Sequence, residues 1–152
     1  MNNRNRKQKA GSKPEDILKE KGRLVLTAEG FSMLPCIHPN TDVLFLEQPK
    51  EKIRPLQVIL YKRKSGGYVL HRVMEVREEG CVLCGDNQYK KEYGIQDSQI
   101  LGVLKGFYRG EVYVDCEKSR GYQRYVKLWC SPFFPRRIAV WIIKIGRRIG
   151  KV

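Results

Sequence analysis

The sequence predicts a mainly β protein with a short helix before the β-rich body and a basic amphipathic helix after it. Two observations carry this prediction. Short apolar runs bounded by Gly, Pro, Asn, Asp or Lys recur through the middle of the chain, whereas helical patterns occur only near its two ends. A length of 152 residues is that of one domain. Short strands at this spacing favour a barrel-like or folded sheet.

The elements follow one another in a simple order. Residues 1–13 are expected to form a disordered basic arm. Ser12, as an N-cap before Pro14 and Glu15, then predicts a helix that ends near Gly22. The strands are expected at residues 24–27, 43–46, 58–61, 68–76, 81–84, 99–107 and 111–116. Hairpin turns are predicted at residues 65–67 and 109–110.

The segment from Arg136 to Gly150 is predicted to be an amphipathic helix. Four isoleucines fall on one stripe with Trp141 at its edge, and cations cluster on the opposite side: Ile138, Ile142, Ile145 and Ile149 against Lys144, Arg147, Arg148 and Lys151. Such a helix can lie on an anionic membrane surface. It can also dock on its own domain through the isoleucines, and the pattern leaves both interpretations open.

The net charge of +14 lies at the two ends of the chain. Residues 1–13 carry five Lys and Arg and residues 118–152 carry ten, with no acid in either segment. Residues 14–117 hold 15 basic and 16 acidic residues, a net charge of −1. We therefore divide the chain into a basic arm (1–13), a β-rich domain (14–117), which also contains the candidate catalytic residues described below, and a basic extension (118–152). Cationic ends suit lipid headgroups or nucleic acid, and a solvated tail is the simpler explanation of the arm.

Cysteine usage favours a reducing compartment, because five cysteines are an odd number without a dense framework. Cys81 and Cys84 have C-x-x-C spacing, but no second pair completes a zinc site, and we interpret them as buried strand cysteines. No metal or other cofactor is expected. The N-terminus lacks a signal peptide pattern, and the longest apolar run, residues 138–143, is too short for a transmembrane helix. We expect a cytoplasmic protein or one that is peripheral at the membrane.

Ser32 is the candidate nucleophile. Gly30 before it permits unusual backbone angles and Pro35 after it rigidifies the chain, so the serine is expected on a turn with its hydroxyl exposed. Backbone N–H groups of such a turn could form an oxyanion hole together with neighbours such as Phe31 and Met33. A serine hydroxyl needs a neighbouring base to become a nucleophile.

His71 is the preferred base, because imidazole is neutral near pH 7 and can accept a proton. The strand pattern places it on one face with Val69 and Val73, a setting equally typical of a buried core histidine. His38, in a loop close to Ser32, ranks second. Asp86, in a Gly-Asp-Asn turn, and Glu92 are the two candidates for orienting the imidazole, and the sequence does not choose between them.

The order of these segments resembles the signal peptidase I and repressor-cleaving (LexA-like) superfamily of serine peptidases. The matching segments are Gly30-Phe31-Ser32-Met33-Leu34-Pro35, residues 68–73 with His71, Gly85-Asp86-Asn87 and Ile100-Leu101-Gly102-Val103. The Ser-His pair is similar to the archaeal and endoplasmic-reticulum branch. The resemblance implies a folded β-sheet body, Ser32 as nucleophile, His71 as base and an acid at Asp86 or Glu92. Gly-Asp pairs of the family correspond here to Thr41-Asp42, which keeps the acid, and Leu56-Gln57, which does not.

Three functions compete on this evidence. The first is a serine endopeptidase that removes a leader or signal segment from a peptide or protein precursor. Such an enzyme could contact an anionic membrane surface through Arg136 to Val152, or act beside a peptide exporter. The second is a LexA-like self-cleaving regulator, for which too few residues precede the body to form a helix-turn-helix domain. The third is a basic nucleic-acid-binding module, but the body lacks an aromatic-basic face, so no nucleic-acid partner is expected.

Overall fold

One antiparallel sheet of eight strands forms the body of the protein. The structure, a computed structural model, describes residues 13–131, 138–143, 145 and 146. The strands are β1 (Arg23–Thr27), β2 (Val43–Glu47), β3 (Val58–Lys62), β4 (Tyr68–Arg77), β5 (Gly80–Cys84), β6 (Glu92–Ile95), β7 (Ile100–Arg109) and β8 (Val112–Asp115). Their order in the sheet is β1-β2-β7-β3-β4-β5-β6, and β8 pairs with β7. The predicted mainly β class is therefore confirmed.

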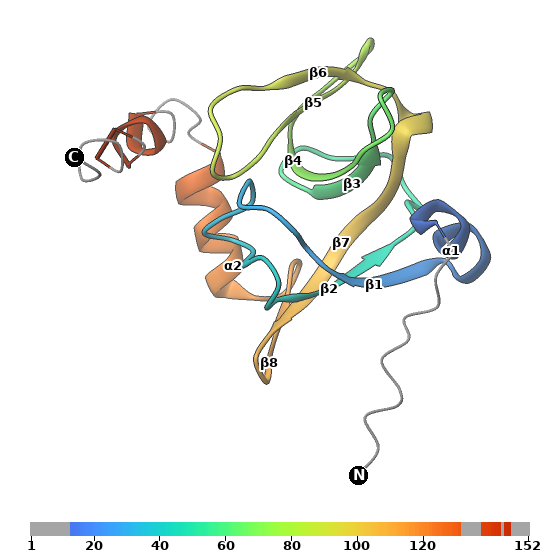
Figure 1. Ribbon diagram of the computed structural model, residues 1–152, viewed down its shortest axis with the longest axis horizontal. Helices are drawn as coiled ribbons and strands as arrows, with labels where there is room; N and C mark the ends of the chain where they lie inside the picture. The colour runs from blue at the N-terminus through green and yellow to red at the C-terminus, as the bar shows by residue number, and fades with distance from the viewer. Residues whose placement is uncertain (1–12, 132–137, 144, 147–152) are drawn as a thin grey trace.

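The long strand β7 joins the two halves of this sheet. Its second half pairs with β2 along one edge and with β8 along the other, and its first residues pair with β3. In Figure 1 it runs through the middle, with β1, β2 and β8 in the lower half and β3 to β6 in the upper half. Because β1 stands at one end of the strand order, one of its edges is not covered by a described strand.

The sheet buries side chains on both faces. Alternate residues of β3 belong to two different core clusters, Val58 and Leu60 to the first, Ile59 and Tyr61 to the second. This is why β3 reads as a continuous apolar run rather than an alternating one. The same alternation in β4 places Val73 in the second cluster, on the face predicted for His71.

Helix α1 (Pro14–Lys21) begins and ends close to the predicted bounds. Its N-cap residue is Lys13, which makes no side-chain capping bond, so the predicted cap at Ser12 is wrong by one position. Gly22 ends the helix at φ +69°, in the left-handed region that glycine adopts readily. Leu18 is 2% exposed and fixes the helix on the first core cluster.

A second helical segment follows β8. It consists of α2 (Arg120–Tyr125) and a π-helical continuation, η2 (Val126–Cys130), and Figure 1 shows it along the side of the sheet. Tyr122, Val126 and Cys130 recur every fourth residue, share one helix face and are buried in the first core cluster. The basic extension that the sequence placed after residue 117 therefore begins with a segment packed into the body.

The C-terminal segment is helical over the described residues 138–143, 145 and 146. Val140 is its buried residue, whereas Ile138 and Ile142 are 46% and 57% exposed, so docking through these isoleucines is not observed. Ile149 and the four predicted cations of this helix lie outside the described residues, as does most of the basic arm. None of the helices that the structure describes is long and apolar enough to cross a bilayer.

Candidate active site

Ser32 lies on a turn that begins directly after β1. The Gly-Asp-Asn turn after β5 holds it in place: the Asn87 N–H donates to the Ser32 carbonyl at 2.8 Å, and Asn87 Nδ2 donates to the Phe31 carbonyl at 3.1 Å. Gly85 allows this contact, since a Cβ added there would lie 2.6 Å from the Ser32 carbonyl oxygen. Two segments that are far apart in the sequence thus fix the serine backbone.

The Ser32 turn has the backbone features expected from the sequence, but Ser32 itself is half-buried rather than exposed. Gly30 adopts φ +78°, where a side chain would be strained. Met33 is 3% exposed and anchors the turn in the core, while Phe31 is 67% exposed. The Leu34–Pro35 peptide is cis. Among the described residues, the backbone N–H groups of Ser32 and Met33 donate to no protein acceptor, which leaves them available to a ligand.

His71 lies on β4 with its imidazole on the face of the second core cluster. It pairs across the hairpin with Ile59 of β3 and is 2% exposed. The Tyr61 hydroxyl lies 3.4 Å from its Nδ1. Tyr61 is not among the residues expected from the sequence. The predicted hairpin turn at residues 65–67 could have indicated it. This turn sets the register in which Ile59 pairs with His71, and Tyr61, two positions after Ile59, lies on the same face of the sheet.

Ser32 and His71 line one pocket of about 270 Å³. Residues 28–30 bring the serine into it from the end of β1, and residues 68–70 bring the histidine from the start of β4. The contacts that His71 makes with other described side chains involve Nδ1, so Nε2 is the nitrogen available to a group in the pocket. The pocket therefore contains a hydroxyl and a neutral imidazole, the two parts of a nucleophile–base pair.

Glu92 is the acid beside the imidazole. Its Oε1 lies 3.4 Å from His71 Nδ1, which favours the tautomer with the proton on Nδ1 and the lone pair on Nε2. Arg63 binds the same carboxylate through two nitrogens, with Nε 3.0 Å from Oε2. Burial raises the pKa of Glu92, but the hydrogen bonds from Arg63 and Tyr61, together with the charge of Arg63, outweigh it, and the pKa lies below its usual value.

The surroundings of His71 keep the imidazole neutral. Burial lowers the pKa of His71 to about 4, the Glu92 carboxylate opposes this change, and Arg63 adds to it. Burial and Glu92 also raise the pKa of Tyr61, so its hydroxyl keeps its proton. A neutral imidazole can accept a proton from a hydroxyl, and the carboxylate on its other nitrogen would stabilise the imidazolium that forms.

Asp86 is held on the other face of β4. Arg72 donates to both of its carboxylate oxygens, at 2.8 and 2.7 Å, and Tyr125 donates to Oδ2 at 2.9 Å. Arg72 and Asp86 are both fully buried. Because Arg72 and His71 are neighbours in a strand, their side chains point to opposite faces. Of the two candidate acids, the structure thus brings Glu92 to the imidazole and uses Asp86 to tie the Gly-Asp-Asn turn to α2.

The remaining sequence positions have structural explanations. His38, the second-ranked base, is exposed, and its backbone N–H donates to Asp42 at 2.8 Å. Asp42 is fully buried and accepts two hydrogen bonds from Arg109. Leu56 adopts φ +71°, the left-handed region that favours glycine, which explains why a glycine would suit this position. Leu56 also packs against the first core cluster.

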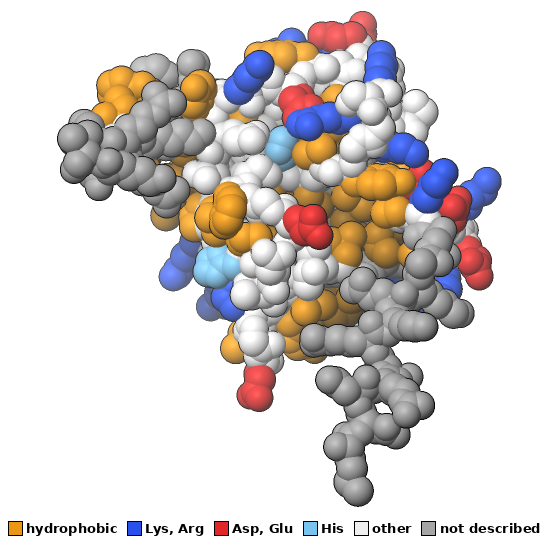
Figure 2. All heavy atoms as spheres, viewed as in Figure 1, with side chains coloured by type: hydrophobic (Ala, Val, Ile, Leu, Met, Phe, Trp, Pro, Cys, Tyr) orange, Lys and Arg blue, Asp and Glu red, His pale blue; other side chains and the backbone are white. Residues whose placement is uncertain are grey.

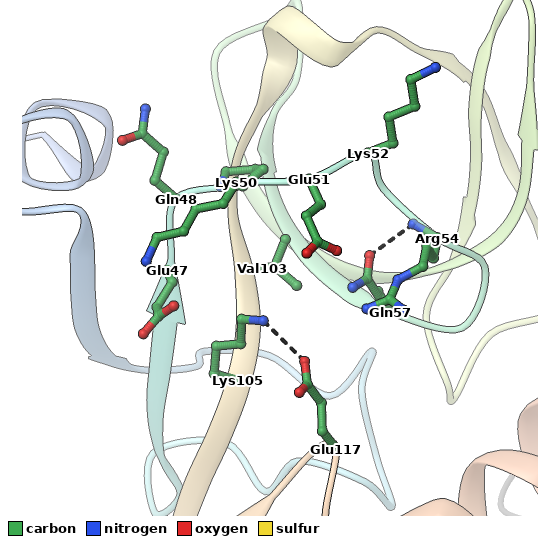
Figure 3. A pocket seen from close by; sticks show the side chains of 11 residues that line it. Glu47, Gln48, Lys50, Glu51, Lys52, Arg54, Gln57, Val103, Lys105 and Glu117 are labelled. Atoms are coloured by element: carbon green, nitrogen blue, oxygen red, sulfur yellow. Dashed lines mark hydrogen bonds and ion pairs between the residues drawn. The ribbon is translucent and has the colours of Figure 1, made fainter.

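A second pocket, of about 230 Å³, lies where the β2–β3 connection faces β7 (Figure 3). Charged side chains of both signs line it, and one pair, Lys105 and Glu117, is 3.1 Å apart. Serine, cysteine and histidine are not among its lining residues, so it offers neither a hydroxyl or thiol nucleophile nor an imidazole base. Elsewhere in the described part of the chain, no group of three or more His, Cys, Asp or Glu side chains could hold a metal ion. Cys81 and Cys84 are buried in β5, as predicted.

Comparisons with protein-family models, with curated proteins and with solved structures return no match to this chain.

Proposed function

We propose that the protein is a serine endopeptidase of the signal peptidase type, which removes a leader or signal segment from a peptide or protein precursor. Ser32 is the nucleophile, His71 the general base, and Glu92 the acid that orients the imidazole. The observation that carries this proposal is the shared pocket of Ser32 and His71, with Glu92 on the far nitrogen of the ring. We propose further that the sheet is the folded sheet of that superfamily.

In the proposed reaction, these groups act in two stages. His71 Nε2 takes the proton of Ser32 as its Oγ attacks the scissile carbonyl carbon. The carbonyl oxygen gains negative charge and is bound by the N–H groups of Ser32 and Met33. The imidazolium passes its proton to the leaving amine, and an acyl-serine remains. Water, deprotonated by His71, then hydrolyses the ester and restores both side chains.

The substrate is expected to bind as an extended chain. The edge of β1 that no described strand covers leads directly into residues 28–30 and the pocket. An extended peptide can add to such an edge by backbone hydrogen bonds. The pocket is small, which favours short side chains next to the scissile bond.

A cleavage assay tests the proposal. The full chain is incubated with a library of synthetic peptides, and products are identified by mass spectrometry. Endoproteolysis by the native protein should be lost equally in Ser32→Ala and His71→Ala and kept in His38→Ala. Cleavage that survives Ser32→Ala would refute the assignment of the nucleophile, and cleavage that survives His71→Ala would move the base elsewhere.

We also infer that the enzyme works at an anionic lipid surface. Large apolar side chains are exposed on the last helical segments, among them Leu128, Trp141 and Ile142 at 77%, 58% and 57%. Figure 2 shows hydrophobic side chains at the surface of the C-terminal segment, on the left of the molecule. Residues 118–152 carry ten cations and no acid. An apolar helix face with Trp and neighbouring cations matches the boundary between headgroups and acyl chains.

Vesicle flotation distinguishes this surface from its alternatives. The native chain should float with phosphatidylglycerol vesicles and stay behind with phosphatidylcholine, and Trp141→Ser/Ile142→Ser should reduce flotation. Val112→Ser is the matched control, because Val112 is 66% exposed on β8. If the double variant floats as well as the native chain, or if the native chain does not float, the membrane role is contradicted. The exposed apolar side chains would then be better explained by contact with a protein partner.

A further inference from the structure

Arg63 lies beside the proposed catalytic pair, in the hairpin between β3 and β4. It follows β3 directly, and its backbone is fixed in the β3–β4 hairpin by bonds with Gly66 and Gly67. Its side chain is 44% exposed. Together with Gln88 it lines the Ser32–His71 pocket and also a neighbouring hollow of about 330 Å³. Arg63 thus stands between the proposed catalytic pair and an adjoining space.

The adjoining hollow is basic. Its lining residues include Arg63, Lys90 and Glu92, two cations and one carboxylate. Glu92 is already bound by Arg63. The Lys90 ammonium forms no ion pair within the part of the chain that the structure describes. The charge of Lys90 in the adjoining hollow is therefore not neutralised by a described side chain, whereas Glu29 lines the Ser32–His71 pocket from the turn before Ser32.

We propose that Arg63 and Lys90 form a subsite for an acidic side chain of the substrate, at one fixed position relative to the scissile bond. This proposal rests on the proposed peptidase function and adds a substrate class to it. A guanidinium binds a carboxylate through two parallel hydrogen bonds, which fixes both its charge and its direction. Arg63 binds Glu92 through Nε and one terminal nitrogen, so its remaining guanidinium donors can bind a substrate carboxylate while the pair with Glu92 is kept.

The test uses peptide pairs that differ by one charge. A library of synthetic peptides is cleaved by the native protein, and the best substrate is remade with its Asp or Glu replaced by Asn or Gln. We expect the acidic peptide to be cleaved with a kcat/KM at least about fivefold higher. Arg63→Gln should remove this preference, and Arg63→Glu should transfer it to a peptide with Lys at the same position. Lys64→Glu, in the same hairpin but in neither pocket, is the matched control and should keep the acidic preference.

The charge swap also guards against misfolding, because a variant that gains activity on the Lys peptide must be folded. Fluorescence anisotropy of the same peptides with Ser32→Ala measures their affinity in the absence of cleavage, and the acidic peptide should bind more tightly than the neutral one. Cleavage without an acidic preference, or a preference that persists in Arg63→Gln, would overturn the subsite alone. Failure of the native protein to cleave any peptide would overturn the peptidase function, and the subsite with it.

Discussion

Replacement of Glu92 by Gln removes the charge that faces His71. The carboxylate oxygen lies 3.4 Å from Nδ1 of the imidazole, close enough to stabilise an imidazolium. Gln keeps the shape of the side chain, but its amide can donate to Nδ1 and so favour the tautomer with the proton on Nε2. That tautomer cannot accept the proton of Ser32. We therefore expect Glu92→Gln to slow the reaction through both charge and tautomer.

The size of the effect follows from Coulomb's law. Two unit charges about 3.4 Å apart interact by roughly 5 kcal/mol at an effective dielectric constant near 20, and by roughly 1 kcal/mol in water. The Glu92 side chain is 27% exposed and shares its charge with Arg63, so the lower part of this range applies. A loss of about 1.5–3 kcal/mol in the transition state corresponds to a decrease in kcat/KM of roughly 10- to 100-fold.

The assay is cleavage of the best library peptide by Glu92→Gln and by Glu75→Gln. Glu75 lies on β4 like His71, but it pairs with Arg77 and Lys91 and lines neither pocket beside the histidine. Glu75→Gln should stay within about twofold of the native protein. If Glu92→Gln also stays within twofold while its thermal stability is unchanged, the carboxylate has no part in the reaction and our reasoning is refuted.

Four further predictions rest on the same contacts. Gly85→Ala should lower kcat/KM at least about tenfold, because the new Cβ would lie 2.6 Å from the Ser32 carbonyl and displace the turn; native kinetics would show that the turn tolerates the shift. Asp86→Ala should lower the free energy of unfolding by about 3–5 kcal/mol, measured by denaturant titration, since it leaves the fully buried Arg72 without its carboxylate; a loss below about 1 kcal/mol would contradict the buried pair. The pH dependence of kcat/KM should fall on its acid side with a midpoint near pH 4, because burial lowers the pKa of His71 to about 4, and a midpoint near 6.5 would contradict that environment. The unfolded chain binds the extra proton between about pH 4 and 6.5, so the same shift should also reduce the unfolding free energy by up to about 3 kcal/mol as pH falls through this window.

The strands of the body were predictable because their apolar runs are continuous and bounded by turn residues. β6 was missed since Glu92–Ile95 contains a charged residue and a glycine, and it is a strand through its pairing with β5. The segment at Arg120–Cys130 was missed because Gly121 and its aromatic and β-branched residues favour a helix weakly. The spacing of Tyr122, Val126 and Cys130, four residues apart, was the available signal.

The candidate site was predictable only where a short stretch of sequence has a recognisable local pattern. The turn around Ser32 and the strand that carries His71 each have a local pattern, and the structure brings them to one pocket. The choice between Asp86 and Glu92 depends on which face of β4 each acid meets, and this is set by long-range pairing. Arg63 reaches the site through the β3–β4 hairpin and forms its bond with Glu92 across 29 residues of sequence, so no local pattern marks it.

The central claim is that Ser32 is activated by His71, and covalent labelling tests it most directly. The native chain is treated with a serine-directed covalent probe, and the modified residue is located by tandem mass spectrometry. We predict one label on Ser32, at a rate that drops by at least about 100-fold in His71→Ala. A label on a different residue, or an undiminished rate on Ser32 when the imidazole is gone, would contradict the account.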